Sequence, residues 1–140
     1  MRAVVIGGTG HIGTYLVPRL VEAGYEVISV TRQAREPYRP HAAWKSVQKV
    51  TLDRAAAEEA GQFGPRIRAM AADVVIDLIC FTPASARHLA EALQGQVCQF
   101  LHCGTIWVHG HSVQTPTTET QPRQPFGQYG VDKAAIEAYL

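Results

Sequence analysis

Three glycines at intervals of three residues follow directly on a short apolar run near the start of the chain. The stretch AVVIGGTGHIG, residues 3–13, predicts a buried strand that ends at Gly7, with Gly10 and Gly13 completing a GxxGxxG pattern. A strand, a glycine-rich turn and a helix in this order form an arrangement that binds dinucleotides. The first glycine allows a tight turn, the second lets backbone approach a pyrophosphate, and the third lets helix and strand pack closely.

The residues between these glycines belong to the same predicted phosphate-binding loop. We expect Thr9, His11 and Ile12 to contact the cofactor together with the three glycines. His11 is expected to lie near phosphate in the first helical turn rather than to act as a catalyst. A plain turn between strand and helix, with no ligand, is the alternative interpretation of the pattern.

Strand-like and helix-like segments alternate along the chain, which predicts an α/β fold. Apolar runs predict strands at residues 2–6, 26–31, 44–52, 73–80 and 99–103. Helical periodicity predicts helices at residues 11–23, 54–72 (interrupted at 61–65), 83–93 (with Thr82 as cap) and from 129 onward. Such alternation is typical of right-handed βαβ units, so we expect a Rossmann-like, doubly wound parallel sheet of about five strands in the order 3-2-1-4-5.

Composition restricts the class of protein and its partners. The 140 residues are 46% hydrophobic and 18% charged, which is enough to bury a core. The formal net charge of +1 gives no electrostatic reason to expect a nucleic acid or a membrane as partner. No apolar run approaches the roughly 20 residues that span a bilayer, and no leader precedes the first strand. We expect a cytoplasmic protein with Cys80, Cys98 and Cys103 as buried, reduced thiols.

The end of the second predicted strand bears on which dinucleotide would bind. A carboxylate there would bind the 2′-hydroxyl of the adenine ribose, but the stretch VTRQAR carries Arg32 and Arg35 and no acid. A planar guanidinium pairs with two phosphate oxygens at once, which suits a 2′-phosphate. We therefore expect Arg32 to favour NADP, with NAD as the alternative cofactor. Solvated loop arginines are the plainer interpretation.

A tyrosine and a lysine lie four residues apart near the end of the chain. The stretch QYGVDK places Tyr129 and Lys133 on one face of the last predicted helix. Free tyrosine, with a pKa of about 10, is a poor acid–base group at neutral pH, but a nearby ammonium stabilises the phenolate. Thr105, in FLHCGTIWVHG, follows a predicted strand, and a hydroxyl there could donate a hydrogen bond to a substrate oxygen. An exposed first helical turn is the alternative interpretation of the tyrosine and lysine.

Taken in chain order, these motifs resemble those of the extended short-chain dehydrogenase/reductase family, which includes NAD(P)-dependent epimerases, dehydratases and reductases. The motifs are GxxGxxG near residue 10, TLDR with Asp53, the strand DVVIDLIC, the hydroxyl before WVHG, and YGVDK. The resemblance extends over essentially the whole chain. Motifs that agree in order are far more specific together than either the glycines or the tyrosine–lysine pair alone.

The resemblance implies a role for particular residues. Tyr129 would be the acid–base residue and would lie against the cofactor. Lys133 would stabilise the phenolate form of Tyr129 and bind the cofactor ribose. Thr105 is similar to the serine or threonine of the family, and Asp53 to the residue that contacts the adenine. The residues that would line the cofactor at the end of the fourth strand are Leu78, Ile79 and Cys80.

Several features depart from the family pattern. WVHG carries His109 where the family usually has tyrosine, and DVVIDLICF lacks the His-Leu-Ala-Ala run of many sugar-nucleotide epimerases. Asp77 lies inside an apolar strand, where we expect backbone N–H groups to satisfy it. Members of the family have further strands and most of the substrate pocket beyond the equivalent of Leu140. We therefore expect residues 1–140 to be the dinucleotide-binding domain of a longer enzyme, and the sequence leaves open whether this chain is active by itself.

The expected reaction is hydride transfer at a carbon of a small-molecule substrate that bears a hydroxyl or carbonyl group. One alternative is an NAD-dependent sugar-nucleotide epimerase or dehydratase. Another is a non-catalytic module on the same fold that senses dinucleotides or associates with RNA. The resemblance further implies a homodimer through the Tyr129–Leu140 helix. His109 and His111 are too few for a metal site, so we expect none.

Overall fold

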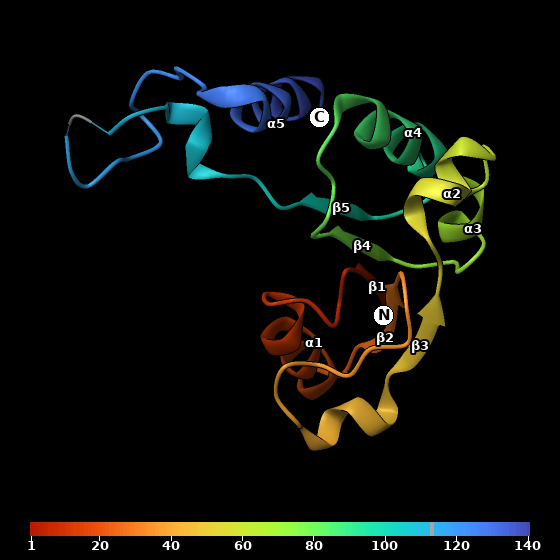
Figure 1. Ribbon diagram of the computed structural model, residues 1–140. Helices are drawn as coiled ribbons and strands as arrows, with labels where there is room; N and C mark the ends of the chain where they lie inside the picture. Colours follow the sequence, from red (N-terminus) through yellow and green to blue (C-terminus); the bar gives the residue numbers. More distant parts are fainter. Residues whose placement is uncertain (113) are drawn as a thin grey trace. The chain divides into compact units, whose positions relative to one another are not determined.

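Five parallel strands form one sheet in the computed structural model, which describes residues 1–112 and 114–140. The sheet order is β3-β2-β1-β4-β5, which confirms the predicted order 3-2-1-4-5 (Figure 1). The strands are β1 (Arg2–Ile6), β2 (Glu26–Thr31), β3 (Gln48–Thr51), β4 (Val74–Asp77) and β5 (Gln99–His102). The chain passes from β1 to β2 on one side, and β4 lies on the other. The switch point of the sheet therefore lies between the carboxyl ends of β1 and β4.

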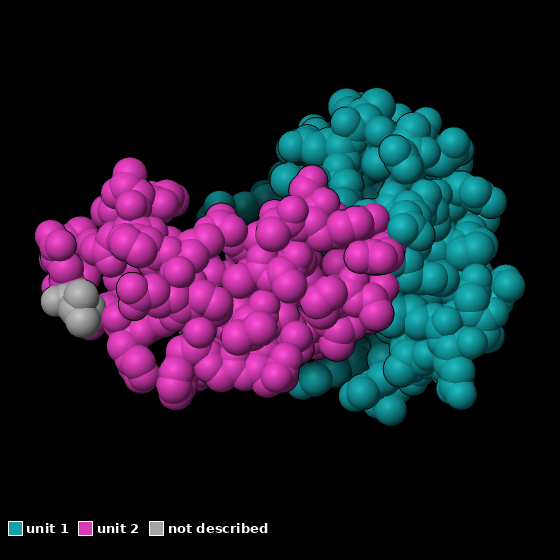
Figure 2. Space-filling model, turned by 90° about the horizontal axis from the view of Figure 1, so that it is seen from above, with its two compact units in different colours: residues 1–79, 88–103 teal, residues 80–87, 104–140 magenta. Residues whose placement is uncertain are grey.

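Helices and two short 3₁₀ turns connect the strands. They are α1 (Gly13–Glu22), η1 (Ala42–Ser46), α2 (Arg54–Glu59), α3 (Phe63–Arg68), α4 (Pro83–Leu93), η2 (Ile106–His109) and α5 (Gly127–Tyr139). The chain divides into two compact units, coloured separately in Figure 2. The sheet unit comprises residues 1–79 and 88–103, and the C-terminal unit comprises residues 80–87 and 104–140. Among the helices described, none is long and apolar enough to cross a membrane.

Side chains on both faces of the central strands are buried, which explains why these strands are almost continuously apolar. Val4 and Ile6 of β1 belong to a core cluster with side chains of α2, α3 and α4. Ala3 and Val5, which point to the opposite face, belong to a second cluster with α1 and η1. Figure 1 accordingly shows α1 on one side of the strands and α2 and α3 on the other.

The first helix begins later than the sequence predicts. The predicted helix at residues 11–23 is observed as Gly13–Glu22, and Ile12 precedes it as the N-cap residue. Ile12 is 49% exposed. Its backbone is already helical, and its carbonyl accepts from the N–H groups of Tyr15 and Leu16 at 3.1 Å, as expected of the residue that precedes the first helical turn.

Other predicted boundaries were broader than the observed elements. The predicted strand 73–80 is paired only over Val74–Asp77, because the chain leaves the sheet directly after Asp77. The predicted helix 54–72 consists of α2 and α3 and ends at Arg68. The break between them lies at residues 60–62 rather than at the predicted 61–65, because Phe63, Gly64 and Pro65 form the first turn of α3, where a proline is tolerated. Thr82 caps α4 as predicted, since its hydroxyl accepts from the N–H of Ser85 at 3.2 Å. Cys98 is exposed rather than buried, because it lies in the bend that precedes β5.

Candidate functional site

The glycine loop lies between β1 and α1, at the switch point of the sheet. The N–H of Gly7 donates to the carbonyl of Val30 at 2.8 Å, and the N–H of Gly10 donates to the carbonyl of Gly7 at 2.9 Å. The first bond continues the pairing of β1 with β2, and the second closes a tight turn immediately after β1. Gly7 has a φ of 87°, a left-handed conformation that favours glycine.

Close packing explains the glycine at the start of α1. A β-carbon on Gly13 would overlap the main chain of Gly8, so α1 could not lie as close to the loop. A β-carbon on Gly7 would come within 2.7 Å of the Ile79 side chain, which follows β4. The loop is therefore fitted between the first helix and the end of β4, and larger side chains at these positions would displace it.

The amino-terminal end of α1 provides hydrogen-bond donors for an anion. Within the described residues no side chain caps this end, and the first turn of α1 contains no acidic residue. The N–H groups of Thr14 and Tyr15 already donate to the carbonyls of Gly10 and Ile12, at 2.9 and 3.1 Å. An anion would therefore be bound by N–H groups of the loop residues just before them, where the helix dipole adds positive potential. Thr9 is buried, whereas His11 and Ile12 are exposed beside the turn. This cradle fits a pyrophosphate.

The loop that follows β2 carries three arginines with different surroundings. The guanidinium of Arg35 lies 5.0 Å from the ring centroid of Tyr38, and that of Arg39 lies 5.8 Å from the ring of Tyr15. Both are held against aromatic faces. Arg32 follows the last residue of β2 directly and is exposed at the carboxyl edge of the sheet.

The same loop returns to the start of α1. The N–H of Tyr38 donates to the hydroxyl of Thr14 at 3.0 Å. The rings of His11 and Tyr38 lie 5.9 Å apart, with one edge directed at the other. The arginine-rich loop after β2 therefore lies next to the glycine loop, so phosphate groups of one ligand could contact both.

Asp53 follows β3 at the same edge of the sheet and caps α2. Its carboxylate accepts from the N–H of Ala56 at 3.1 Å, the usual geometry of an N-cap residue. Thr31 and Thr51 are register partners in the neighbouring strands β2 and β3. Asp53 and Arg32 thus follow the carboxyl ends of adjacent strands, at the position where the adenosine end of a dinucleotide is expected to bind.

Asp77 is fully buried at the end of β4, and a side chain that sequence reasoning missed neutralises it. Arg54, the first residue of α2, donates from one guanidinium nitrogen to both carboxylate oxygens, at 2.9 and 2.8 Å. The N–H of Ile79 donates to the same carboxylate at 3.2 Å. The expectation that backbone N–H groups satisfy Asp77 is confirmed for the N–H of Ile79, and Arg54 is the partner that it missed. The available signal was an arginine at the start of the helix after β3.

The three residues predicted to line the cofactor after β4 separate into two groups. Leu78 and Ile79 are half-buried and flank the position where a β-carbon of Gly7 would lie. Cys80 instead belongs to the C-terminal unit, where its side chain is buried with Ala86 and Ile136. Its thiol is thus enclosed in a small core, and its main-chain carbonyl is the group that contacts a predicted catalytic residue.

That residue is Lys133, on the inner face of α5. Its ammonium donates to the carbonyl of Cys80 at 3.0 Å and lies 6.0 Å from the centroid of the Phe81 ring. Only 2% of Lys133 is exposed. Tyr129, one turn earlier, is 41% exposed, and its ring lies 6.4 Å from Phe81 and 6.0 Å from Trp107. The lysine is held in place, and the tyrosine is accessible to a ligand.

Thr105 caps the 3₁₀ turn η2 in the same unit. Its hydroxyl oxygen accepts from the N–H of Trp107 at 3.4 Å. Because the oxygen acts as acceptor toward the chain, the hydroxyl proton is available for a different acceptor. Thr105, Tyr129 and Lys133 therefore belong to one unit, built on η2 and the first turns of α5. The glycines, Arg32, Asp53, Leu78 and Ile79 belong to the sheet unit.

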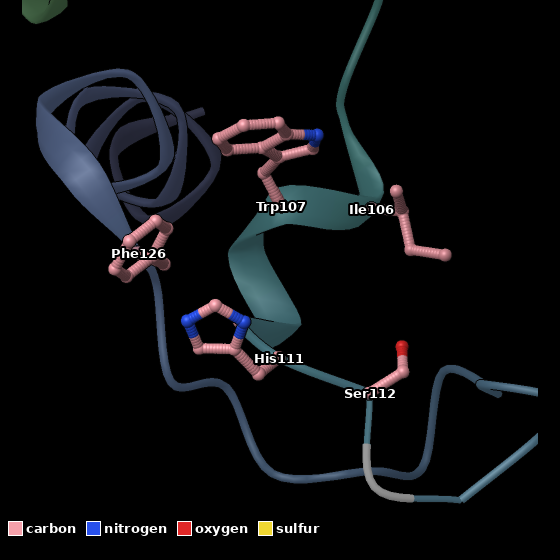
Figure 3. A pocket seen from close by; sticks show the side chains of 6 residues that line it. Ile106, Trp107, His111, Ser112 and Phe126 are labelled. Carbon is pink, nitrogen blue, oxygen red and sulfur yellow. The ribbon is translucent and has the colours of Figure 1, made fainter.

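An aromatic pocket beside η2 is a feature that sequence reasoning missed. It is lined by Ile106, Trp107, Gly110, His111, Ser112 and Phe126 (Figure 3). The imidazole of His111 lies 4.4 Å from the Phe126 ring, and the indole of Trp107 lies 6.4 Å from it. The side chains come from η2, from the loop after it and from the residue before α5. No periodicity predicts that these segments meet.

Comparison with known proteins places the chain among nucleotide-dependent enzymes. The model of the NAD dependent epimerase/dehydratase family matches residues 3–140. The chain is 31% identical, over 137 residues, to a 2'-dehydrokanamycin reductase of Streptomyces kanamyceticus, with coverage of 98% of this chain and 37% of the reductase. It is 25% identical, over 154 residues, to a UDP-glucose 4-epimerase of Streptococcus mutans, with coverage of 100% and 46%.

Solved structures lead to the same group of proteins. A crystal structure of UDP-galactose 4-epimerase superposes with a TM-score of 0.78 at 26% sequence identity. The match includes 99% of this chain and 50% of that chain. The chain therefore spans about half the length of the relatives that it matches, or less.

Proposed function

Because the chain belongs to the NAD dependent epimerase/dehydratase family, we propose that residues 1–140 form the dinucleotide-binding part of an enzyme that transfers hydride. The reacting carbon of its small-molecule substrate bears a hydroxyl or carbonyl group, and the cofactor is NADP. The observation that carries the proposal is the uncapped start of α1 behind the glycine loop, with Arg32 at the end of the neighbouring strand. The similarity to a 2'-dehydrokanamycin reductase supports a reaction in which the substrate is reduced.

The proposed binding mode assigns the ends of the cofactor to different residues. The bound dinucleotide supplies or accepts the hydride. The N–H groups of the loop that leads into α1 hold the pyrophosphate, and the close fit of Gly7 and Gly13 lets the backbone reach it. Arg32 pairs with the 2′-phosphate through its planar guanidinium. Asp53, beyond β3, contacts the adenine.

Tyr129 moves the proton that accompanies hydride transfer. Its exposed ring supports contact with the substrate oxygen. A substrate hydroxyl gives its proton to the phenolate when the carbon is oxidised, and a substrate carbonyl oxygen takes the phenol proton when the carbon is reduced. Lys133 supplies a fixed positive charge one turn further along α5, which stabilises negative charge that develops on the tyrosine oxygen. Thr105 donates a hydrogen bond to the same substrate oxygen, because the N–H of Trp107 already occupies its acceptor side.

Calorimetric titration of this chain with NADP and with NAD tests the proposal. We expect NADP to bind more tightly and Arg32→Ala to remove that preference. A hydrogen-bonded charge contributes about 1.5–3 kcal/mol, so NADP affinity should fall about 10- to 100-fold. NAD affinity should hardly change. Arg68→Ala, which removes an exposed arginine from the last turn of α3, is the matched control and should alter neither affinity.

A second candidate function is an NAD-dependent epimerase that restores its cofactor in each turnover. The similarity to UDP-sugar 4-epimerases favours it. It predicts the opposite result in the same titration: tighter binding of NAD and no effect of Arg32→Ala on NADP affinity. That result would overturn the NADP assignment while leaving the glycine loop as the dinucleotide site.

A further inference from the structure

Three large apolar side chains of the aromatic pocket are unusually exposed. Ile106 is 61% exposed, Trp107 50% and Phe126 51%. Together with His111, Ser112 and Gly110 they surround a cavity of about 300 Å³, which is the lower end of the range for small-molecule sites. Exposed apolar side chains gathered around a hollow are typical of binding sites.

The pocket adjoins the proposed acid–base residue through one shared wall. The indole of Trp107 faces Phe126 at 6.4 Å and Tyr129 at 6.0 Å, and its ring is nearly perpendicular to the tyrosine ring. A substrate whose reacting carbon lies at Tyr129 would therefore extend along Trp107 toward Phe126. Figure 3 shows the rings of Phe126 and His111 next to each other near the start of α5.

The chemistry of the walls favours an uncharged group. Among the described residues that line the pocket, none is Lys, Arg, Asp or Glu. The hydroxyl of Ser112 is hydrogen-bonded to that of Thr117 at 2.8 Å, so it is already engaged.

The cationic side chains of the C-terminal unit are occupied as well. Arg123 is ion-paired with Glu137 at 3.1 Å, and Arg87 lies over the Tyr139 ring at 5.1 Å. Lys133 is buried against the carbonyl of Cys80. A diphosphate needs cations or helix N–H groups. The described lining offers no Lys or Arg, whereas α5 begins without a side-chain cap beside Phe126. The walls therefore favour an apolar ring, and a nucleotide sugar is the competing ligand that the test includes.

We propose that the aromatic pocket binds a flat, uncharged apolar ring of the substrate. The enzyme would then act on a secondary alcohol or ketone that carries an aromatic or other apolar ring close to the reacting carbon. Stacking on Trp107 and Phe126 would orient that carbon toward Tyr129, since aromatic side chains offer large, rigid contact areas. This inference rests on the proposed function, because it takes Tyr129 as the acid–base residue.

The two tryptophans of the chain allow a direct test. Trp107 lines the pocket, whereas Trp44 is buried in the core of the sheet unit and serves as an internal control. We would titrate the full chain with 2-acetylnaphthalene, a flat aromatic ketone, and follow the two indole N–H signals by NMR. The Trp107 signal should shift and saturate, while the Trp44 signal stays constant.

Variants locate the binding site. Phe126→Ala should weaken ketone binding at least about tenfold, because it removes one wall. Ile106→Lys, at an exposed position where the fold tolerates change, should do the same by placing a charge in the pocket. Tyr38→Ala removes a comparably exposed aromatic ring from the sheet unit and should leave ketone affinity unchanged. An unchanged Trp44 signal verifies that the sheet unit is folded, and an unchanged methyl signal of the buried Ile136 does so for the C-terminal unit.

Two results would overturn the proposal. One is a Trp107 shift that fails to saturate or that moves together with the Trp44 signal. The other is a saturable shift with UDP-glucose and none with the ketone, which would assign the pocket to a nucleotide sugar. Calorimetry measures NADP affinity separately and so distinguishes this inference from the proposed function. If NADP binds but the ketone does not, only the inference about the aromatic pocket is overturned.

Discussion

At the scale of single residues, the buried pair of Asp77 and Arg54 is the feature that most constrains the end of β4. Asp77 is fully buried, and the positive charge that compensates its carboxylate comes from Arg54, the first residue of α2. The same carboxylate accepts a hydrogen bond from the N–H of Ile79, and the side chain of Ile79 lies against Gly7. The ion pair therefore fixes the segment that supports the glycine loop.

Breaking this pair should destabilise the protein strongly. Asp77→Ala removes the carboxylate that holds one guanidinium nitrogen of Arg54, while the Nε of Arg54 still donates to Glu58 at 2.7 Å. Losing hydrogen bonds between charged groups costs about 1.5–3 kcal/mol in free energy of unfolding. Urea denaturation measures this cost. The control is Glu26→Ala, which breaks the exposed pair of Arg2 and Glu26 and should cost no more than about 1 kcal/mol. Equal costs for the two variants would contradict the assigned role of Asp77.

A double variant separates the missing charge from the missing contacts. Replacing both partners by apolar residues, Asp77→Leu with Arg54→Met, removes both charges of this pair, and it also removes the contact of Arg54 with Glu58. Such a replacement of a buried ion pair is often neutral in stability. We therefore expect the double variant to be more stable than Asp77→Ala. If the double variant instead loses as much stability as the two single variants added together, packing at each position dominates.

At the scale of elements, what the sequence could predict depends on how each element is buried. Strands β1, β2 and β4 are buried on both faces, so their apolar runs stand out. Helix α4 carries a cap at Thr82 that sequence alone identifies. The turns η1 and η2 are too short to produce a period. The pair of Asp77 and Arg54 and the aromatic pocket join segments distant in sequence, which no local pattern encodes.

Asp53 has two possible roles at the start of α2, and substitution distinguishes them. Asp53→Ala removes the cap and should cost about 1 kcal/mol in free energy of unfolding, whereas Asp53→Ser keeps a capping oxygen and should cost a few tenths. If the carboxylate also contacts the adenine, both variants should weaken dinucleotide binding equally. Thermal unfolding and calorimetry measure the two effects. Unchanged affinity in both variants would leave Asp53 with the capping role alone.

At the scale of the whole molecule, the proposed functions are divided between the two units. The sheet unit carries the glycine loop, Arg32 and Asp53, and the C-terminal unit carries Thr105, Tyr129, Lys133 and the aromatic pocket. Dinucleotide affinity and ketone affinity are therefore separate measurements on one chain. Turnover additionally depends on the remainder of the enzyme, because the relatives are at least about twice as long.

Helix α5 has an exposed apolar face that supports self-association. Val131, Ala135 and Ala138 are all exposed at the spacing i, i+4, i+7, and Val131 is 47% exposed. Small side chains in such a row let two helices approach closely. We therefore predict that the chain forms a homodimer through this face of α5, as the family resemblance implies, with the same face used on both copies.

Sedimentation velocity over a range of protein concentrations measures this association. Val131→Lys places a charge in the centre of the predicted interface, where an unpaired buried charge is costly, and should yield a monomer. Leu101→Lys makes the same change at an exposed apolar position of β5 and should leave the dimer intact. A dimer that persists in Val131→Lys but is lost in Leu101→Lys would move the interface from α5 to β5, the last strand of the sheet among the residues that the structure describes.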